Sequence, residues 1–424
     1  MRIGVYGAGR EVGRSAILVE AARTRVLLDY GVKITETVPE FPLPFEGLVD
    51  GIVVSHAHLD HTGYVPHYFT DSETNVFMTP PTRDLSVLLW KDMIKVAKRK
   101  GIEPPYTADH IREAESFTTT YDYYEMVPLT PETSFEFYDA GHIPGSALVK
   151  LYTPEGKILY TGDFKIESTR LHNGADLTGI EADVLIMEST YADEDHPPRK
   201  LLEQRFVESV KETLDQGGFV ILPVFAVGRA QELVDILVSH NVDAPIWFDG
   251  MARDATKIIL RYPEYIANPG RLRRIMRKVN WIRTSADRRR ALEEPGVIVT
   301  TAGMMQGGPV IFYTTALRND PKSKVIFTGY LVEDTPGRRL LEEGIFEADG
   351  YEFRTELKVE RFDFSAHAGR SELFEIVRRV NPSHVVVVHG DEENALRLAE
   401  ELNEQEGVRA FAPRLGERID ISLR

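Results

Sequence analysis

The chain has 424 residues, of which 42% are hydrophobic and 27% charged, and its 50 basic and 66 acidic side chains give a formal net charge of −16. This length predicts two or three folding units of a globular protein, and no apolar run reaches the roughly 18 to 20 residues that a membrane span requires. Because the chain contains no cysteine, disulfides, thiolate–zinc sites and cysteine nucleophiles are excluded, and any metal site must use His, Asp and Glu.

The first elements predicted along the chain are strands at residues 3–6, 15–20, 25–30 and 51–55, which we expect to form a β-meander. Gly7 and Gly9 follow the first strand and resemble the start of a dinucleotide-binding fingerprint. The third glycine, however, is Gly13 where the fingerprint needs one at position 12, and a strand follows where the fingerprint needs a helix. We therefore predict no nucleotide cofactor.

A layered α/β half then continues with helices at residues 83–100 and 109–115 and strands at residues 134–138, 146–152 and 157–161. From residue 199 the pattern alternates: helices at residues 199–215, 228–239 and 252–261, and strands at residues 218–224, 244–250, 296–303 and 323–330. Such alternation is typical of a parallel sheet. A helix at residues 370–379, a strand at 384–390 and a helix at 392–405 complete the chain.

Residues 271–290 form a basic stretch within this acidic protein. They contain nine Arg or Lys residues and one acidic residue, Asp287. The stretch indicates either an ordinary solvated helix surface or a docking surface for a polyanion such as RNA.

The stretch from Ser55 to Gly63 reads SHAHLDHTG and places four metal-ligand side chains close together, namely His56, His58, Asp60 and His61. The first two follow a strand and can project to the same side as the chain leaves the sheet. Two separated imidazoles followed by a carboxylate and a third imidazole can serve two metal ions. Histidine nitrogen and aspartate oxygen suit zinc, and they are also compatible with manganese or iron.

This motif resembles the signature of the metallo-β-lactamase fold, and three further motifs of that fold occur in the expected order. They are Asp29 in VLLDYG, His142 in AGHIPGS and Asp163 in ILYTGDF. The resemblance implies that His56, His58 and His142 hold one metal, that Asp60 and His61 hold the other, and that Asp163 bridges both. It also implies that Asp29 orients a ligand histidine.

Three late motifs resemble those of the β-CASP branch of this fold, in which a second domain is inserted. They are Glu188 in VLIMEST, His367 in FDFSAHAG and His389 in HVVVVHG. The stretches PVFAVGRAQEL, TAGMMQGGP and GYLVEDTPGR, at residues 223–233, 301–309 and 329–338, resemble the inserted domain. The stretches GAGREVGRSA and SAHA are similar to the corresponding motifs of the endonuclease subunit of the cleavage and polyadenylation specificity factor. The motifs begin close to the start of the chain, and in this respect the sequence resembles short archaeal or bacterial members of the family, which lack a KH domain.

The resemblance implies an α/β architecture with an αββα four-layer metallo-β-lactamase domain and an inserted parallel-sheet β-CASP domain. The expected boundaries are residues 1–190 for the first part of the metallo-β-lactamase domain, 191–360 for the insert and 361–424 for the return. We expect a cytoplasmic protein, because the N-terminus lacks the basic and apolar segments of a secretory signal.

The activity implied is that of a zinc-dependent ribonuclease that hydrolyses phosphodiester bonds of single-stranded RNA, endonucleolytically and with 5′–3′ exonuclease action, in RNA processing or decay such as mRNA 3′-end processing. Two Zn²⁺ ions, or Mn²⁺ in their place, would activate hydroxide. By the same resemblance His367 is the general acid, Glu188 favours its protonated form, and His389 completes the second metal's sphere. The family also favours a homodimer.

Phosphate contacts are expected from arginines of the insert, namely Arg229, Arg338, Arg271 and Arg274. Arg229 starts a predicted helix, and helix N-termini favour anions. Three alternatives are weighed against the ribonuclease. The insert and the late motifs disfavour a small-molecule metallo-hydrolase, and the complete ligand set disfavours a non-catalytic RNA-binding subunit. A DNA substrate is not distinguished from RNA by the sequence.

Overall fold

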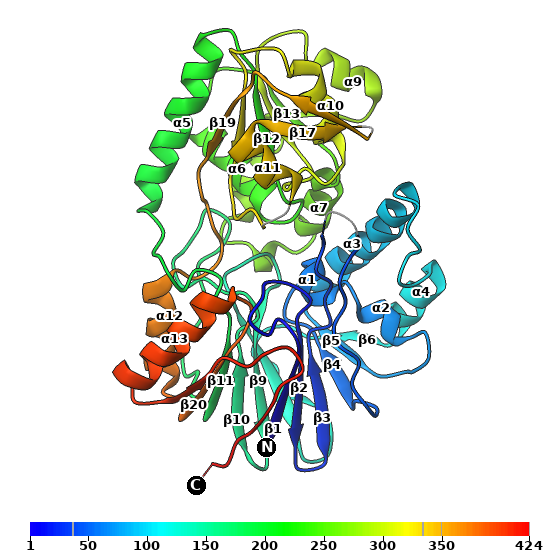
Figure 1. Cartoon of the computed structure of the whole chain (residues 1–424), viewed down its shortest axis with the longest axis vertical. Helices are drawn as coiled ribbons and strands as arrows, with labels where there is room; N and C mark the ends of the chain where they lie inside the picture. Colours follow the sequence, from blue (N-terminus) through cyan, green and yellow to red (C-terminus); the bar gives the residue numbers. More distant parts are fainter. Residues whose placement is uncertain (36–37, 333–334, 349, 424) are drawn as a thin grey trace. The chain divides into compact units, whose positions relative to one another are not determined.

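The computed structural model describes residues 1–35, 38–332, 335–348 and 350–423 (Figure 1). Contacts divide the chain into unit 1, made of Met1–Asp195 and Ala366–Arg424, and unit 2, made of His196–Ser365. Unit 2 is thus inserted into unit 1 in the sequence. Two residues of the stretch 329–338, Glu333 and Asp334, lie outside the described residues. Within the described part of the chain, no helix has the length and apolarity needed to cross a bilayer.

The first sheet of unit 1 has the strand order β22-β1-β2-β3-β4-β5-β6. Its strands are β1 (Arg2–Gly7), β2 (Ala16–Ala21), β3 (Thr24–Leu28), β4 (Gly51–Val53), β5 (Val76–Met78), β6 (Thr118–Thr120) and β22 (Arg418–Asp420). Strands β1 to β3 form the predicted antiparallel meander. The prediction was wrong for the fourth strand, because β4 pairs with β3 in parallel. The connection of residues 29–50 is a long crossover, as a parallel pair requires, and not a hairpin turn.

The second sheet has the strand order β21-β20-β11-β10-β9-β8-β7. Its strands are β7 (Val127–Pro128), β8 (Ser134–Asp139), β9 (Ala147–Thr153), β10 (Gly156–Tyr160), β11 (Val184–Met187), β20 (His384–Val387) and β21 (Arg409–Phe411). Strands β8 to β10 are antiparallel, whereas β10, β11, β20 and β21 run parallel. The chain therefore returns from unit 2 directly beside β11, with Val184 opposite His384.

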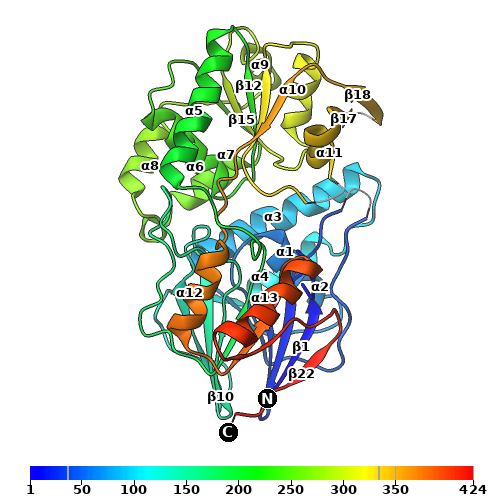
Figure 2. The same ribbon diagram turned by 60° about the vertical axis from the view of Figure 1, so that its left-hand side comes forward.

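In unit 1 the two sheets lie between two groups of helices, which gives four layers (Figures 1 and 2). Apolar side chains join the layers. One cluster between the sheets combines Ile17 of β2 with Phe135 of β8 and Val386 of β20. A second packs the other face of the first sheet against α2 (Val65–Tyr68), α3 (Pro80–Arg99) and α4 (Ala108–Ser116). A third packs the other face of the second sheet against α12 (Arg370–Val380) and α13 (Glu392–Gln405). The predicted αββα architecture is confirmed.

Unit 2 is built on a six-stranded sheet of order β14-β13-β15-β12-β16-β19, and all of its pairs are parallel. The strands are β12 (Val220–Pro223), β13 (Ile246–Asp249), β14 (Asn280–Trp281), β15 (Val297–Thr300), β16 (Lys324–Phe327) and β19 (Lys358–Arg361). The larger helices are α5 (Arg199–Asp215), α6 (Arg229–Ser239), α7 (Ala252–Ile259), α10 (Pro309–Leu317) and α11 (Pro336–Glu343). β17 (Ile345–Ala348) and β18 (Tyr351–Arg354) form a separate hairpin. The predicted parallel sheet is confirmed.

The basic stretch 271–290 does not form one helix surface. It is divided among α8 (Pro269–Ile275), strand β14 and α9 (Ser285–Arg290). Its apolar residues Leu272, Ile275 and Ile282 are buried. These buried apolar residues anchor the stretch to the core of unit 2. Most of its basic side chains remain exposed at the surface.

A buried carboxylate at the end of β13 anchors one cation of this stretch. Asp249 is 0% exposed, and it accepts hydrogen bonds from Arg288 Nε at 2.7 Å, Arg288 Nη2 at 3.2 Å and the Tyr313 hydroxyl at 2.8 Å. If the cation partner is removed, the buried carboxylate still lacks hydration, and the ion pair no longer compensates for that loss. We expect Arg288→Met to lower the free energy of unfolding by about 2–3 kcal/mol, measured by urea denaturation.

The matched control for this variant is Arg289→Met, because Arg289 is the neighbouring residue of the same helix and is exposed. Its free energy of unfolding should stay within about 0.5 kcal/mol of the wild type. Equal stability of the two variants would show that the contact to Asp249 does not hold this end of the sheet.

Candidate metal centre

The predicted ligands lie just after the ends of strands from both sheets of unit 1. His56 and His58 follow β4, Asp163 follows β10 and His389 follows β20. The carboxyl ends of parallel strands are where polar side chains can leave the backbone toward a site, and here such ends from both sheets contribute to one cluster. All of these residues belong to unit 1.

The first group of ligand atoms comprises His56, His58, His142 and Asp163, which all lie within 4.8 Å of one another. His142 Nε2 lies 3.2 Å from His58 Nδ1, and His56 Nε2 lies 3.4 Å from Asp163 Oδ2. Burial is the main cause that lowers the pKa of His56 and His142, and with the neighbouring His56 it lowers the pKa of His58 to about 3. The imidazoles are therefore neutral, as metal ligation requires.

The second group comprises Asp60, His61, Asp163 and His389. Asp60 and His61 lie in α1 (Leu59–Thr62), directly after His58. His61 Nε2 lies 3.3 Å from Asp163 Oδ2, and His389 Nε2 lies 3.2 Å from Asp60 Oδ2. Although burial opposes it, Asp163, Asp60 and Asp29 raise the pKa of His61 well above its usual value. A divalent cation in this group would replace that proton as the partner of the carboxylates.

Asp163 is shared by both groups. Its side chain is 2% exposed, and its Oδ1 atom has no hydrogen-bond partner among the described residues. In the same described part of the chain, His56 Nε2 and His61 Nε2 are also buried without a hydrogen bond. Buried polar atoms are almost always hydrogen-bonded, and converging orphan atoms of this kind indicate a group that they are built to hold. The donor set of imidazole nitrogens and carboxylate oxygens fits two divalent cations on either side of Asp163.

Asp29 lies next to this cluster and fixes the orientation of one imidazole. Its Oδ2 atom is 2.7 Å from His61 Nδ1, so that His61 Nε2 faces the cluster. Ser55 and Tyr160 donate further hydrogen bonds to Asp29, from the Ser55 amide at 2.6 Å and from both hydroxyls at 2.7 Å. Asp29 adopts a positive φ of 59°, and its backbone amide donates to the Val53 carbonyl at 3.0 Å. This geometry is what a role in orienting a metal ligand requires.

Glu188 and His367 form a pair beside Asp163. Glu188 Oε2 lies 2.9 Å from His367 Nδ1 and accepts the Thr190 hydroxyl at 2.6 Å, while Oε1 accepts the Phe164 amide at 2.9 Å. Burial opposes the charged form of His367, but Glu188 and Asp163 outweigh it and raise the pKa of His367 to about 9. The imidazole is therefore protonated near neutral pH in this arrangement.

The four arginines predicted to contact RNA all belong to unit 2, and three of them are held by carboxylates. Arg229 Nη1 lies 2.7 Å from Glu232, and Arg338 Nε lies 2.5 Å from Glu342. Arg271 Nε lies 2.8 Å from Asp235 Oδ2, and its Nη2 reaches Oδ1 of the same carboxylate at 2.6 Å. Arg274 is exposed and forms no ion pair among the described residues.

Sequence reasoning missed the polar residues that support the ligands, including Ser55, Tyr160, Lys165 and Thr190. Ser55, Lys165 and Thr190 carry a weak signal because each lies within two residues of a predicted site residue. Tyr160 ends a strand of apolar residues and reads as core. The role of such residues depends on contacts between distant segments, which no local pattern shows.

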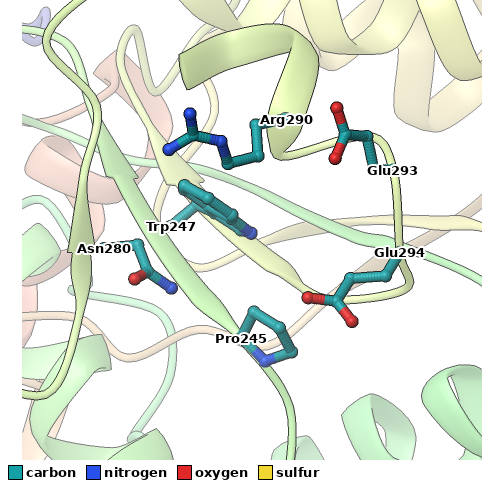
Figure 3. A pocket seen from close by; sticks show the side chains of 6 residues that line it. All are labelled: Pro245, Trp247, Asn280, Arg290, Glu293 and Glu294. Carbon is teal, nitrogen blue, oxygen red and sulfur yellow. The ribbon is translucent and has the colours of Figure 1, made fainter.

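A separate hollow of about 510 Å³ lies in unit 2 (Figure 3). It is lined by Pro245, Trp247, Asn280, Arg290, Glu293 and Glu294. Pro245 precedes β13 and Asn280 begins β14, so the hollow lies at the amino ends of these strands. Ligands of parallel sheets bind at the carboxyl ends. The hollow contains none of the residues that we predicted for the site.

Three family models match consecutive parts of the chain. Residues 5–191 match the Anti-Pycsar protein Apyc1, residues 230–340 match the Beta-Casp domain, and residues 353–413 match the Zn-dependent metallo-hydrolase RNA specificity domain. The first match lies in unit 1 and the second in unit 2.

Two curated relatives and one solved structure are similar to the chain over nearly its whole length. The "Probable RNase MJ4" of Methanocaldococcus jannaschii is 41% identical, over 99% of this chain and 100% of the relative. The "RNase aCSPSF2" of Saccharolobus solfataricus is 39% identical, over 98% of this chain and 85% of the relative. A crystal structure of a protein of unknown function from Enterococcus faecalis V583 aligns over 99% of both chains with a TM-score of 0.61 and 14% identity, which shows a shared fold.

The shared carboxylate predicts how metal content responds to mutation. Protein that is stripped with chelator, reloaded with zinc and desalted should carry two ions per chain. His58→Ala should carry about one, because it leaves the second group intact, and Asp163→Ala should carry neither, because both groups lose their common ligand. Inductively coupled plasma mass spectrometry gives the count.

The matched control is His67→Ala, because His67 is half-buried and its Nδ1 hydrogen-bonds to the Pro105 carbonyl at 2.7 Å, outside the two groups. It should keep both ions. Retention of two ions by Asp163→Ala would contradict the sharing of this carboxylate.

Proposed function

Because the chain belongs to the β-CASP family of metallo-β-lactamase-fold ribonucleases, we propose that it is a zinc-dependent ribonuclease that hydrolyses phosphodiester bonds of single-stranded RNA. The observation that carries the proposal is the pair of His/Asp groups joined by Asp163, with the Glu188–His367 pair beside them. End-to-end similarity to two relatives named as RNases supports RNA as the substrate.

Seven side chains would hold the metal ions. His56, His58 and His142 would bind one, Asp60, His61 and His389 the other, and Asp163 would touch both. Two bound divalent cations would supply a nucleophile from water near neutral pH and neutralise the charge that develops at phosphorus. Zinc suits this all-nitrogen-and-oxygen set, and manganese is the alternative that the metal analysis would identify.

His367 is the group of this chain that would deliver a proton. Hydrolysis must protonate the oxygen that leaves phosphorus, and a general acid in place contributes about 10²- to 10⁴-fold to the rate. His367 Nδ1 is engaged by Glu188 at 2.9 Å, which directs the ring and favours its protonated form. Nε2 is then the nitrogen that would give the proton. The 2′-hydroxyl takes no part, so the expected products carry 5′-phosphate and 3′-hydroxyl ends.

The surface that would dock RNA is the basic part of unit 2. The exposed cations of the stretch 271–290 are Arg273, Arg274, Arg277, Lys278, Arg283, Arg289 and Arg290. We assign Arg274 to this surface. Arg229, Arg271 and Arg338 would contact phosphate only by exchanging a carboxylate partner, which makes them weaker candidates than their sequence positions indicate.

We expect zinc-loaded wild type to cut 5′-labelled single-stranded RNA internally, with 5′-phosphate ends on the downstream products. His367→Ala should reduce the rate by about 10²- to 10⁴-fold while keeping its metal. Asp60→Ala should lose cutting together with one ion. Gel analysis of end-labelled RNA measures all three.

Single-stranded DNA of the same sequence is assayed in the same way. If the DNA is cut faster than the RNA, the protein is a DNA-directed enzyme. A metal-loaded wild type that binds RNA without cutting it would indicate a non-catalytic RNA-binding subunit and would end the ribonuclease proposal. Undiminished cutting by both variants would remove their assigned roles.

The docking surface predicts a change in salt dependence. Replacing Arg274 and Arg277 with alanine should weaken RNA binding at low salt and should reduce the slope of log K against log salt by roughly 0.7 per lost contact. Arg112→Ala is the control, because Arg112 is a 70% exposed arginine of α4 in unit 1. Fluorescence anisotropy of a labelled RNA measures the slopes. Equal slopes for all variants would show that RNA does not dock on this stretch.

A further inference from the structure

Hydrogen bonds within unit 1 hold the segment that carries His367. We call residues 366–369 the return loop, because they follow unit 2 and precede α12. The Ala366 carbonyl accepts a hydrogen bond from the ligand His142, whose Nδ1 lies at 2.8 Å. Further along the loop, the His367 carbonyl accepts from Lys165 Nζ at 3.3 Å, and the Gly369 amide donates to Glu372 Oε2 at 2.9 Å. The contact to Glu188 fixes the His367 ring, and these contacts fix its backbone.

Lys165 and Glu372 form an ion pair between two segments that are distant in the sequence. Lys165 Nζ lies 3.3 Å from Glu372 Oε2. Glu372 also accepts the amides of Ile166 at 2.9 Å and Glu167 at 2.6 Å. The carboxylate thereby ties the chain just after Asp163 to the start of α12, where its charge is also favourable to the helix N-terminus.

This ion pair lies largely out of water. Lys165 is 3% exposed, and the Glu372 side chain is 16% exposed. A buried ion pair contributes little net stability, since desolvation offsets the attraction, but it specifies one arrangement of the groups that it joins. Here it specifies the distance between the backbone after Asp163 and the backbone of His367.

We propose that Lys165 and Glu372 are positioning residues that place His367 to protonate the leaving oxygen. The inference rests on the proposed function. In the step concerned, a water oxygen bonds to phosphorus and its proton passes to solvent. The bond from phosphorus to O3′ breaks, its electron pair stays on O3′, and the proton of His367 Nε2 moves to O3′. Solvent then reprotonates the imidazole.

The variants that test this are Lys165→Met, which keeps the aliphatic stem, and Glu372→Gln, which keeps the shape of the side chain. Each is compared with wild type on two RNA oligonucleotides of one sequence. One has normal linkages, and the other has sulfur in place of O3′ at the linkage that wild type cuts. A thiolate leaves without needing a proton, so the sulfur substrate removes the need for a general acid.

A displaced general acid should reduce kcat on the normal RNA by about tenfold to hundredfold in either variant. KM and zinc content should stay at the wild-type values, and the rate on the sulfur substrate should fall less than about twofold, because that substrate does not use the group being displaced. This contrast between the substrates separates positioning of the acid from general damage to the site.

The matched control is Lys324→Met. Lys324 is also 3% exposed and pairs with a carboxylate, Glu360, at 2.6 Å, but it belongs to the sheet of unit 2. It should leave both rates unchanged. Equal losses on both substrates, or no loss on either, would overturn the inference while wild-type cutting of RNA upholds the proposed function. A zinc-loaded wild type that cuts neither substrate would overturn both.

Discussion

The cluster of His and Asp side chains in unit 1 depends on one buried carboxylate, Asp163, on which the imidazoles converge. Its Oδ2 atom lies 3.4 Å from His56 Nε2, 3.3 Å from His61 Nε2 and 3.7 Å from His142 Nε2, and its Oδ1 atom lies 3.4 Å from His389 Nδ1. An isolated carboxylate at this depth would cost several kcal/mol in lost hydration. The imidazoles around it cannot all be protonated at once without repelling one another, which is why the centre fits cations better than it fits protons.

Holding so many polar groups in place requires a rigid frame around them. The apolar cluster between the two sheets fixes the strands whose ends carry the ligands. Hydrogen bonds then set the individual rings, as Asp29 does for His61 and the Ala366 carbonyl does for His142. The same principle extends from the proposed metal ligands to the proposed proton donor, because Glu188 contacts the ring of His367 and Lys165, paired with Glu372, contacts its carbonyl.

The side chains that converge on Asp163 could be picked out from the sequence because they lie in short motifs whose order along the chain is distinctive, as SHAHLDHTG is around His56. The parallel pairing of β4 with β3 could not be predicted from the sequence, because it depends on how the chain connects the two strands. The contact of Lys165 with Glu372 spans 207 residues and has no local signal. The Arg229 contact differs, since Glu232 follows three residues later in a helix and the spacing itself predicts the ion pair. Arg271 pairs with Asp235 across two helices, which only the fold reveals.

Anomalous diffraction at the zinc edge from crystals of the zinc-loaded protein tests the central claim most directly. Two peaks about 3.5–4 Å apart, one beside His56, His58 and His142 and the other beside Asp60, His61 and His389, with Asp163 in contact with both, are the predicted result. A single peak, or two peaks of which only one contacts Asp163, would contradict the account.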